Sequence, residues 1–270
     1  MSEMDVINKS NKPYTKQDII RDLKTLGVKK GDCLLVHSSL SKLGWIVGGA
    51  VTIVEALVEV VGDTGTLVMP CFSGDNSDPK NWQNPPVPLG WLDVIKENMP
   101  AFDPALTPTR GMGVIVNTFR YYPDTLRSNH PQVSFVARGK DAKRLLDNHQ
   151  LTPGFGKESP LYRLYEKNAK VLLLGVGYEN CTCMHLGETW LENPTFESTG
   201  ASVLIDNKAT WVSFQEIAYN DEDFKKIGEA YEKTCVVTKG NIGQGVSRLL
   251  EIKSITDFAY EWMKENRKRF

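Results

Sequence analysis

Two short apolar segments with a very apolar helical stretch between them constrain the fold of this chain more than any other feature. Residues 33–37 (CLLVH) and 65–70 (GTLVMP) have the length and composition of buried strands. The stretch between them, VTIVEALVEVV at 51–61, is expected to form a helix capped by Thr52 and Glu55. A strand, a helix and a strand within about forty residues predict a βαβ unit in a largely parallel sheet.

The same alternation of strand and helix returns in the middle of the chain. SFVARG at 134–139 and KVLLLGVG at 170–177 are predicted strands, and a helix is expected through 143–148. Another helix is expected after Ser159, because Pro160 at the first helical position after a serine cap is a firm start signal. An α/β fold built on a largely parallel sheet accounts for both parts of the chain.

Residues 71–110 differ in kind, because they hold seven prolines, two tryptophans and only one short predicted helix, near 91–99. Long ordered loops of this sort usually line a binding site or cover one. We therefore expect this segment to form part of the wall of a functional site.

The last part of the chain has a different pattern. The segments 201–206 and 210–218 lie on either side of a short polar turn and are typical of a β-hairpin. A helix, a strand and a final amphipathic helix are expected to follow, the last capped by Ser254 and Asp257. We expect an α+β appendage packed on the sheet, and hence a single domain over residues 1–270.

Charge and composition exclude several kinds of partner. The formal net charge is −1, whereas a nucleic-acid-binding protein usually carries a clustered basic footprint. The cluster Arg267, Lys268 and Arg269 is interpreted as the positive charge that a helix C-terminus favours. No stretch approaches the ~20 apolar residues that cross a bilayer, and residues 1–12 lack the apolar run of a secretory signal. With an odd number of cysteines, five, these features predict a cytoplasmic protein with reduced thiols.

Of the four histidines, His185 has the most informative surroundings. It follows a glycine-rich strand end, and ligands in open α/β sheets bind beyond the carboxyl ends of strands. Glu188 lies three residues later, so in a helix its carboxylate shares a face with the imidazole and can stabilise an imidazolium. The pair is a candidate general base, although the same spacing also suits an ordinary surface pair. His149, at the end of a polar helix, is interpreted as structural.

Cys181, Cys183 and His185 form a compact C-x-C-x-H sequence. A zinc site would need a fourth ligand and usually a second pair at wider spacing, so we expect no metal. A Cys–His nucleophile is a stronger alternative, since a thiolate beside an imidazole can form an acyl-enzyme. Residues two apart on a helix point to different faces, however, which disfavours attack by Cys183 with the help of His185. We therefore interpret Cys71, Cys181 and Cys183 as packing residues.

Three polar motifs stand at predicted element boundaries. His37, Ser38 and Ser39 end the first strand and lead to glycines before a helix, which offers backbone N–H groups to an anion or a carbonyl. The glycine spacing matches neither a P-loop nor a dinucleotide fingerprint. TPTRGMG at 107–113 and RSNHP at 127–131 place a cation or hydroxyl groups where phosphate contacts commonly lie, but each arginine can equally clamp carbonyl groups.

These motifs occur in the order found in one family. The chain resembles the aminoglycoside 3-N-acetyltransferase family of antibiotic N-acetyltransferases, and most closely its YokD-like bacillary members. The stretches that carry the resemblance are HSSLSKLGWIVGGA (37–50), GTLVMP (65–70), TPTRGMG (107–113), RSNHP (127–131), ESPLYRLY (158–165), VLLLGVG (171–177) and H-x-x-E (185–188). The C-terminal elements match in general layout only.

The resemblance implies a three-layer α/β/α fold with a central, mostly parallel or mixed sheet. It also implies acetyl-CoA as the acetyl donor, His185 as the catalytic histidine and Glu188 as its partner carboxylate. The donor-binding segments of the family fall on residues His37, Ser38, Ser39, Leu40, Thr107, Thr109, Arg110, Gly111, Met112, Ser159 and Leu161 of this chain.

The function implied is acetyl-CoA-dependent N-acetylation of the 3-amino group of an aminoglycoside, a small polycationic amine, as in antibiotic resistance. His185 would take a proton from the amine, and N–H groups near Ser38–Leu40 or the hydroxyl of Thr182 would stabilise the oxyanion. A pocket for such an amine should be acidic, and the candidates for its wall are Asp75, Asp78, Glu192 and Glu197.

Two alternatives remain open. The same chemistry can serve another amino sugar or small amine, because a resemblance indicates the reaction better than the substrate. The alternative in which the protein is not an enzyme is a non-catalytic acyl-CoA-binding protein. The His185–Glu188 pair argues against it, because binding alone needs neither residue. No nucleic acid or membrane partner is expected, and a homo-oligomer is left open.

Overall fold

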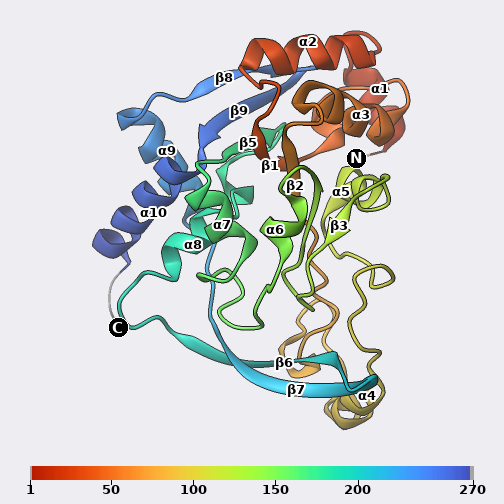
Figure 1. The fold of residues 1–270 in the computed structure, drawn as a ribbon, viewed down its shortest axis with the longest axis vertical. Coiled ribbons are helices and arrows are strands. Elements are labelled where there is room, and N and C mark those ends of the chain that lie inside the picture. Colours follow the sequence, from red (N-terminus) through yellow and green to blue (C-terminus); the bar gives the residue numbers. More distant parts are fainter. Residues whose placement is uncertain (1, 268–270) are drawn as a thin grey trace.

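The computed structural model describes residues 2–267, in which a mixed sheet lies between two layers of helices (Figure 1). The strand order of the seven-stranded sheet is β3-β4-β2-β1-β5-β9-β8. The strands are β1 (Cys33–Ser38), β2 (Thr66–Pro70), β3 (Leu126–Arg127), β4 (Phe135–Gly139), β5 (Lys170–Leu174), β8 (Thr238–Ile242) and β9 (Gly245–Glu251). β1 pairs in parallel with β2 and β5, and the outer pairs are antiparallel. The expected α/β class is confirmed, and the sheet is mixed as the resemblance allowed, whereas the largely parallel sheet predicted from the strand and helix segments is wrong because, among the described strands, only the two pairs of β1 are parallel.

The helices form one layer on each face of the sheet. The first layer contains α2 (Lys16–Leu26), α3 (Gly49–Val61) and α5 (Gly113–Arg120), with α1 (Glu3–Lys9) beside it. The second layer contains α6 (Ala142–Leu146), α7 (Pro160–Glu166), α8 (Met184–Glu188), α9 (Phe224–Thr234) and α10 (Ile252–Asn266). As predicted, Ser159 caps α7, since its hydroxyl accepts the N–H of Tyr162 at 3.3 Å.

β1 separates the two halves of the hydrophobic core. Leu34 and Val36 pack under the first helix layer, whereas Leu35 packs under the second. All three are fully buried, and each contributes about 1.5–3 kcal/mol by leaving water. Because both faces are covered, the strand is a continuous apolar run in the sequence and not an alternating one.

α3 begins earlier than the sequence predicts. Its N-cap is Gly48, in a left-handed conformation (φ +78°), and the hydroxyl of Thr52 donates to the carbonyl of Val47 at 2.6 Å. Glu55 forms an ion pair with Lys16 of α2 at 3.2 Å. The prediction that Thr52 and Glu55 cap this helix is wrong, because the glycine turn allows the helix to start almost one turn earlier.

α10 also begins before its predicted cap. Ile252 is its first residue, and the hydroxyl of Ser254 accepts a hydrogen bond from the Tyr231 hydroxyl at 2.7 Å. Asp257 accepts one from the Tyr165 hydroxyl, also at 2.7 Å. The polar side chains interpreted as caps therefore connect α10 to α9 and α7.

The C-terminal part is more closely joined to the sheet than the predicted appendage. The single strand expected before the last helix is a pair, β8 and β9, and β9 pairs with β5. The predicted hairpin is confirmed as a separate ribbon of β6 (Phe196–Ile205) and β7 (Lys208–Ile217), which runs beside α4 (Leu92–Asn98) (Figure 1). Asn76, in the proline-rich segment, bonds in both directions with the backbone of Ser202 and so fastens that segment to the ribbon.

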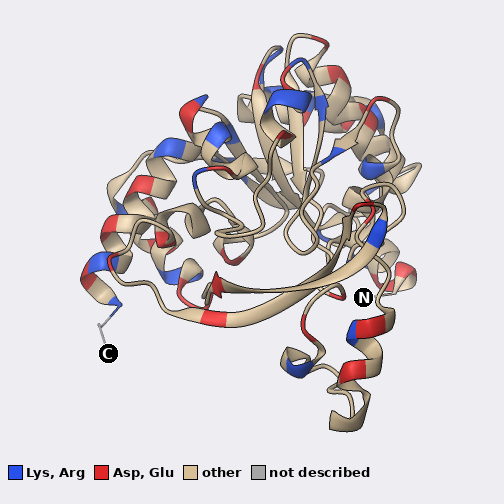
Figure 2. Ribbon diagram, turned by 60° about the horizontal axis from the view of Figure 1, so that its bottom comes forward, with Lys and Arg blue, Asp and Glu red and all other residues tan. Residues whose placement is uncertain are grey.

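Charged residues concentrate on the helices and outer loops, and the strands of the central sheet carry few of them (Figure 2). Lys170, at the start of β5, is paired with Asp32 at 3.0 Å. Among residues 2–267, no helix combines the length and the apolar character needed to cross a membrane.

A buried pair of histidines lies beside β4. The rings of His130 and His149 have centroids 4.6 Å apart. Nδ1 of His130 accepts the N–H groups of Gln132 and Val133 at 3.1 and 3.0 Å, and Nε2 of His149 donates to the carbonyl of Gly154 at 2.7 Å. Burial lowers the pKa of His130 to about 3 and that of His149 to about 4. Both imidazoles are therefore neutral parts of the scaffold.

This pair predicts a loss of stability in mild acid. An unfolded histidine takes up a proton near pH 6.5, but the native pair does so only near pH 3–4, so the unfolded state binds more protons in between. The free energy of unfolding should fall by up to ~1.4 kcal/mol per pH unit for each histidine as the pH drops from 6.5 to 4. Urea unfolding at several pH values measures the slope. A His130→Gln variant with the same slope as the parent would contradict this assignment.

Candidate active site

α8 carries His185 and follows the carboxyl end of β5. The chain leaves β5 through Gly175 (φ +68°), where a Cβ would lie only 2.9 Å from the Leu43 side chain, so glycine is required. The hydroxyl of Ser247, on β9, accepts the N–H of this glycine at 3.1 Å. A short 3-10 turn at Tyr178–Asn180 then leads into α8. This route brings His185 within electrostatic range of His37 at the end of β1.

His185 and Glu188 are hydrogen-bonded to each other on one face of α8, as their spacing predicts. Nδ1 of His185 bonds to Oε2 of Glu188, and the N–H of Asn220 donates to Oε1 at 3.0 Å. The Glu188 side chain is 3% exposed and that of His185 is 13% exposed, so the bond between them is shielded from water. Because the carboxylate is the acceptor, Nδ1 carries the hydrogen and Nε2 offers a lone pair.

Three aromatic rings surround the imidazole. The ring of Phe155 is stacked on it at 5.0 Å and 6°, and the rings of Tyr219 and Phe224 lie 5.3 and 4.6 Å away. Such packing restricts rotation of the imidazole and excludes water from its faces. The sequence pointed to none of these rings, because they come from two segments distant from His185 in the sequence, around 155 and at 219–224, and no local motif marks them.

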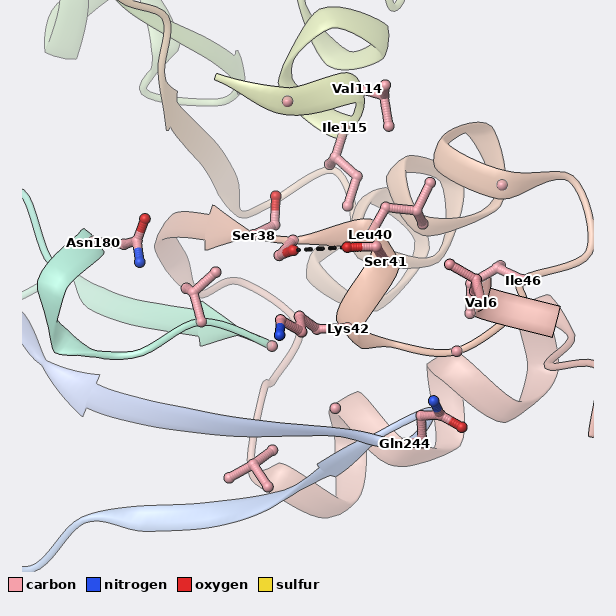
Figure 3. Close-up of a pocket in the computed structure, with 18 of the residues that line it drawn as sticks. Val6, Ser38, Leu40, Ser41, Lys42, Ile46, Val114, Ile115, Asn180 and Gln244 are labelled. Carbon is pink, nitrogen blue, oxygen red and sulfur yellow. Dashed lines mark hydrogen bonds between the residues drawn. The ribbon is translucent and has the colours of Figure 1, made fainter. Parts of the chain in front are cut away.

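A large groove lies at the carboxyl ends of β1 and β5. Its volume is about 1160 Å³, above the ~300–1,000 Å³ of common small-molecule pockets, and suits an elongated ligand. Figure 3 shows Ser38 and Lys42 near its centre, with Asn180 on one side and Val6 and Ile46 on the other. The wall at residues 175–180 continues directly into the turn before α8. The groove and the His185–Glu188 pair are therefore connected by one short segment.

Five of the eleven predicted donor-binding residues line this groove. They come from the end of β1 and the start of α5, and they are Ser38, Ser39, Leu40, Gly111 and Met112. The hydroxyl of Ser38 is buried and has no hydrogen-bond partner among the described residues, which leaves a donor free for a ligand.

The other six predicted donor-binding residues lie outside the lining of the groove. They were predicted because the donor-binding segments of the similar family fall on them, and they are His37, Thr107, Thr109, Arg110, Ser159 and Leu161. His37 is buried on the opposite face of the sheet, and burial lowers its pKa to about 3. Ser159 caps α7, and Leu161 is part of the core. Thr109 donates to Asn117 at 2.5 Å.

The two arginines of the polar motifs differ in their contacts. Arg127 clamps the proline-rich segment, since it donates to the carbonyls of Thr107 and Cys71 at 2.6 and 2.9 Å and to the hydroxyl of Ser134 at 2.9 Å. Arg110 is exposed and forms an ion pair with Asp75. For Arg127, the structure thus favours the carbonyl clamp over a phosphate contact.

Carboxylates near the proline-rich segment are partly neutralised by cations. Asp75 is paired with Arg110, and Asp78 is buried beside Lys96 at 3.0 Å. The sequence did not point to Glu216, which is buried and accepts the N–H groups of Gly154 and Ile217 at 2.8 and 2.7 Å. Burial raises the pKa of this carboxyl.

The cysteines next to the site are enclosed in the core. Cys181 and Cys183 are buried, with their sulfur atoms 3.4 Å apart. The neighbouring thiol and burial together raise the pKa of the Cys181 thiol well above its ordinary value. A thiolate is the reactive form of cysteine, so this environment disfavours a nucleophilic role and agrees with a packing role.

The chain is similar in sequence and fold to known proteins. A family model described as aminoglycoside 3-N-acetyltransferase matches residues 35–264. The chain is 44% identical to the SPbeta prophage-derived aminoglycoside N(3')-acetyltransferase-like protein YokD of Bacillus subtilis (strain 168), over 97% of this chain and 96% of that protein. The crystal structure of YokD has a TM-score of 0.97, with 43% identity over 99% of this chain and 100% of that one.

Two structures with bound ligands are similar as well. AAC-IIIb, in a binary complex with CoASH, has a TM-score of 0.83 and 28% identity over 94% of this chain and 97% of that one. AAC-VIa, bound to sisomicin, has a TM-score of 0.84 and 29% identity over 94% and 98% of the two chains.

The packing role of the thiols predicts that catalysis does not need them. Cys181→Ala and Cys183→Ala should keep most of the turnover, although each should lose about 1–2 kcal/mol of stability through the small cavity it leaves. Mass spectrometry of the parent protein after incubation with acetyl-CoA alone should show no acetylated cysteine. A stoichiometric adduct on either sulfur would instead support an acyl-enzyme.

Proposed function

The chain belongs to the aminoglycoside 3-N-acetyltransferase family and is an N-acetyltransferase, and we propose that it transfers the acetyl group of acetyl-CoA to the 3-amino group of an aminoglycoside. The match to the family model and the 44% identity to YokD confirm the resemblance that the sequence motifs indicated. The bound CoASH of AAC-IIIb and the bound sisomicin of AAC-VIa support this donor and this class of acceptor. We further propose that residues 1–270 act as one domain.

One observation carries the proposal at the level of residues: a large groove lies at the carboxyl ends of β1 and β5, and residues 175–180 of its wall lead into the helix that carries a shielded His–Glu pair. Ser38 lines the groove on one face of the strand end, and His37 lies near His185 on the other. An acetyl donor in the groove and an acceptor amine at His185 can therefore approach each other across this strand end.

The groove has features that fit acetyl-CoA. Lys42 and Arg248 line it and can contact phosphate groups, and the unpartnered hydroxyl of Ser38 can contact the thioester carbonyl. When bound, acetyl-CoA supplies an activated carbonyl carbon and a thiolate leaving group. For the predicted residues outside the lining, His37, Thr107, Thr109, Arg110, Ser159 and Leu161, a part in donor binding stays a prediction.

In the proposed mechanism His185 acts as the general base. The lone pair of the neutral acceptor amine attacks the thioester carbonyl carbon, and Nε2 takes the proton that the nitrogen loses as the new carbon–nitrogen bond forms. Glu188 stabilises the imidazolium through the Nδ1–H bond. The hydroxyls of Ser38 and Thr182 are the candidate donors to the carbonyl oxygen as negative charge develops on it. The carbon–sulfur bond then breaks, its electron pair leaves on the CoA thiolate, and the proton on His185 passes to that sulfur or to water, which regenerates the base.

A second acceptor class is favoured by a specific observation. Asp75 and Asp78, two of the carboxylates expected to line a polycation pocket, already have cationic partners in Arg110 and Lys96. A smaller amine with fewer positive charges would need fewer free carboxylates. A panel of gentamicin, sisomicin and simple amino sugars, assayed by thiol release from acetyl-CoA, distinguishes the two classes.

His185→Ala tests the role of the base. The variant should lower kcat by roughly 10²–10⁴-fold, while affinity for acetyl-CoA measured by calorimetry stays nearly unchanged. Glu188→Gln should cost less, because it removes a stabilising charge and leaves the imidazole in place. Near-normal turnover by His185→Ala would show that another group takes the proton.

A charge reversal tests the donor groove. Lys42→Glu should weaken acetyl-CoA binding on the order of fivefold at low salt, and less at high salt, because it replaces attraction of phosphate by repulsion. Lys30→Glu makes the same change just before β1, at the other end of the strand, and serves as the matched control. Equal weakening by both variants would mean that net charge, and not the groove, accounts for the effect.

A further inference from the structure

Arg267, at the end of α10, contacts Glu188, the last residue of α8. Its backbone N–H bonds to the carbonyl of Met263 at 2.9 Å and ends the helix. Its Nη1 donates to Oε1 of Glu188, the carboxylate oxygen that does not face His185. The arginine side chain is 23% exposed and that of Glu188 is 3% exposed, so the ion pair is largely removed from water.

Asp223, just before α9, holds the guanidinium in one orientation. Nε of Arg267 donates to Oδ2 of Asp223 at 2.8 Å, and Nη2 donates to Oδ1 at 2.7 Å. Nη2 also donates to the carbonyl of Asn220 at 2.6 Å, while the N–H of Asn220 bonds to Glu188. A bidentate arginine–carboxylate pair combines charge with fixed geometry. This network is more specific than the general preference of a helix end for positive charge.

The buried carboxylate of Glu188 requires such a partner. A charge in a low-dielectric interior is costly unless it is paired and hydrogen-bonded. Oε1 has two donors, Arg267 and the N–H of Asn220, and Oε2 is left to His185. Of these groups, Arg267 is the cation that is charged at every pH at which the enzyme works.

We propose that Arg267 is a positioning residue of the acetyl transfer: it occupies Oε1 of Glu188 so that Oε2 faces Nδ1 of His185. The inference rests on the proposed role of His185 as the base. With Oε2 held in place, the Nδ1 hydrogen stays between imidazole and carboxylate. Nε2 is then the nitrogen that takes the proton of the amine. Lys268 and Arg269, the other members of the basic cluster, lie outside the described residues.

Arg267 acts through Glu188 and lies apart from the groove proposed for the acetyl donor. The cavity of about 410 Å³ that it lines with Glu188 shares no lining residue with the donor groove. A lysine in its place would keep the charge but lose the planar fork that Asp223 and Glu188 share, so Arg267→Lys should restore only part of the function.

A double-mutant cycle with Glu188 tests this role, using the acceptor of highest turnover. Arg267→Met should lower kcat about tenfold to a hundredfold and change the KM for acetyl-CoA less than threefold. In the Glu188→Gln background the same substitution should cost less than about threefold, because its target is already gone. Lys170→Met removes a similarly buried ion-pair cation at the far end of β5 and should leave kcat unchanged. Unchanged kcat in Arg267→Met, or equal losses in both backgrounds, would overturn the proposal.

A spectroscopic measurement tests the same point without an acceptor. In protein labelled with ¹⁵N-histidine, the His185 signal, assigned by its loss in His185→Ala, should report the Nδ1–H tautomer. Arg267→Met should convert it to a mixture of tautomers, as Glu188→Gln does, while thermal melts show that the variant stays folded. A pure Nδ1–H signal in Arg267→Met would refute the proposal. If the parent enzyme acetylates no amine in the panel, the proposed function fails, and the tautomer measurement still decides the role of Arg267.

Discussion

The structure depends on the burial of β1 on both faces. Because successive side chains of a strand point to opposite sides, Leu34 and Leu35 enter different halves of the core. The same alternation continues at the strand end, where Ser38 lines the groove and His37 lies under the other helix layer, within electrostatic range of His185. One strand thus contributes both to the core and to the wall of the groove.

Burial also separates the roles of the histidines. His37, His130 and His149 are buried. Burial lowers the pKa of His37 and His130 to about 3 and that of His149 to about 4. These imidazoles stay neutral at physiological pH and cannot compete as proton carriers. His185 differs because a carboxylate accepts its Nδ1–H and a ring stacks on its face. The carboxylate of Glu188 remains tolerable in the interior because cationic and N–H donors surround it.

Local signals in the sequence predicted local structure well where one residue or one spacing determines the local conformation. Ser159 before a proline caps α7, and the H-x-x-E spacing places His185 and Glu188 together. The same reasoning failed at Thr52 and Ser254, whose side chains bond elsewhere because each helix starts earlier. A capping residue has several partners available nearby, and packing selects among them.

The sequence by itself determined the α/β class, most of the strand and helix segments and the His185–Glu188 pair, because periodicity and spacing act over a few residues. The family followed from the resemblance of several motifs in the same order along the chain. The tertiary structure decided what surrounds that pair. Phe155, Tyr219 and Arg267 reach it from separate elements, and no local pattern marks them. Their positions depend on the strand order and on the helices that pack on the sheet. These long-range contacts form because the whole core is buried.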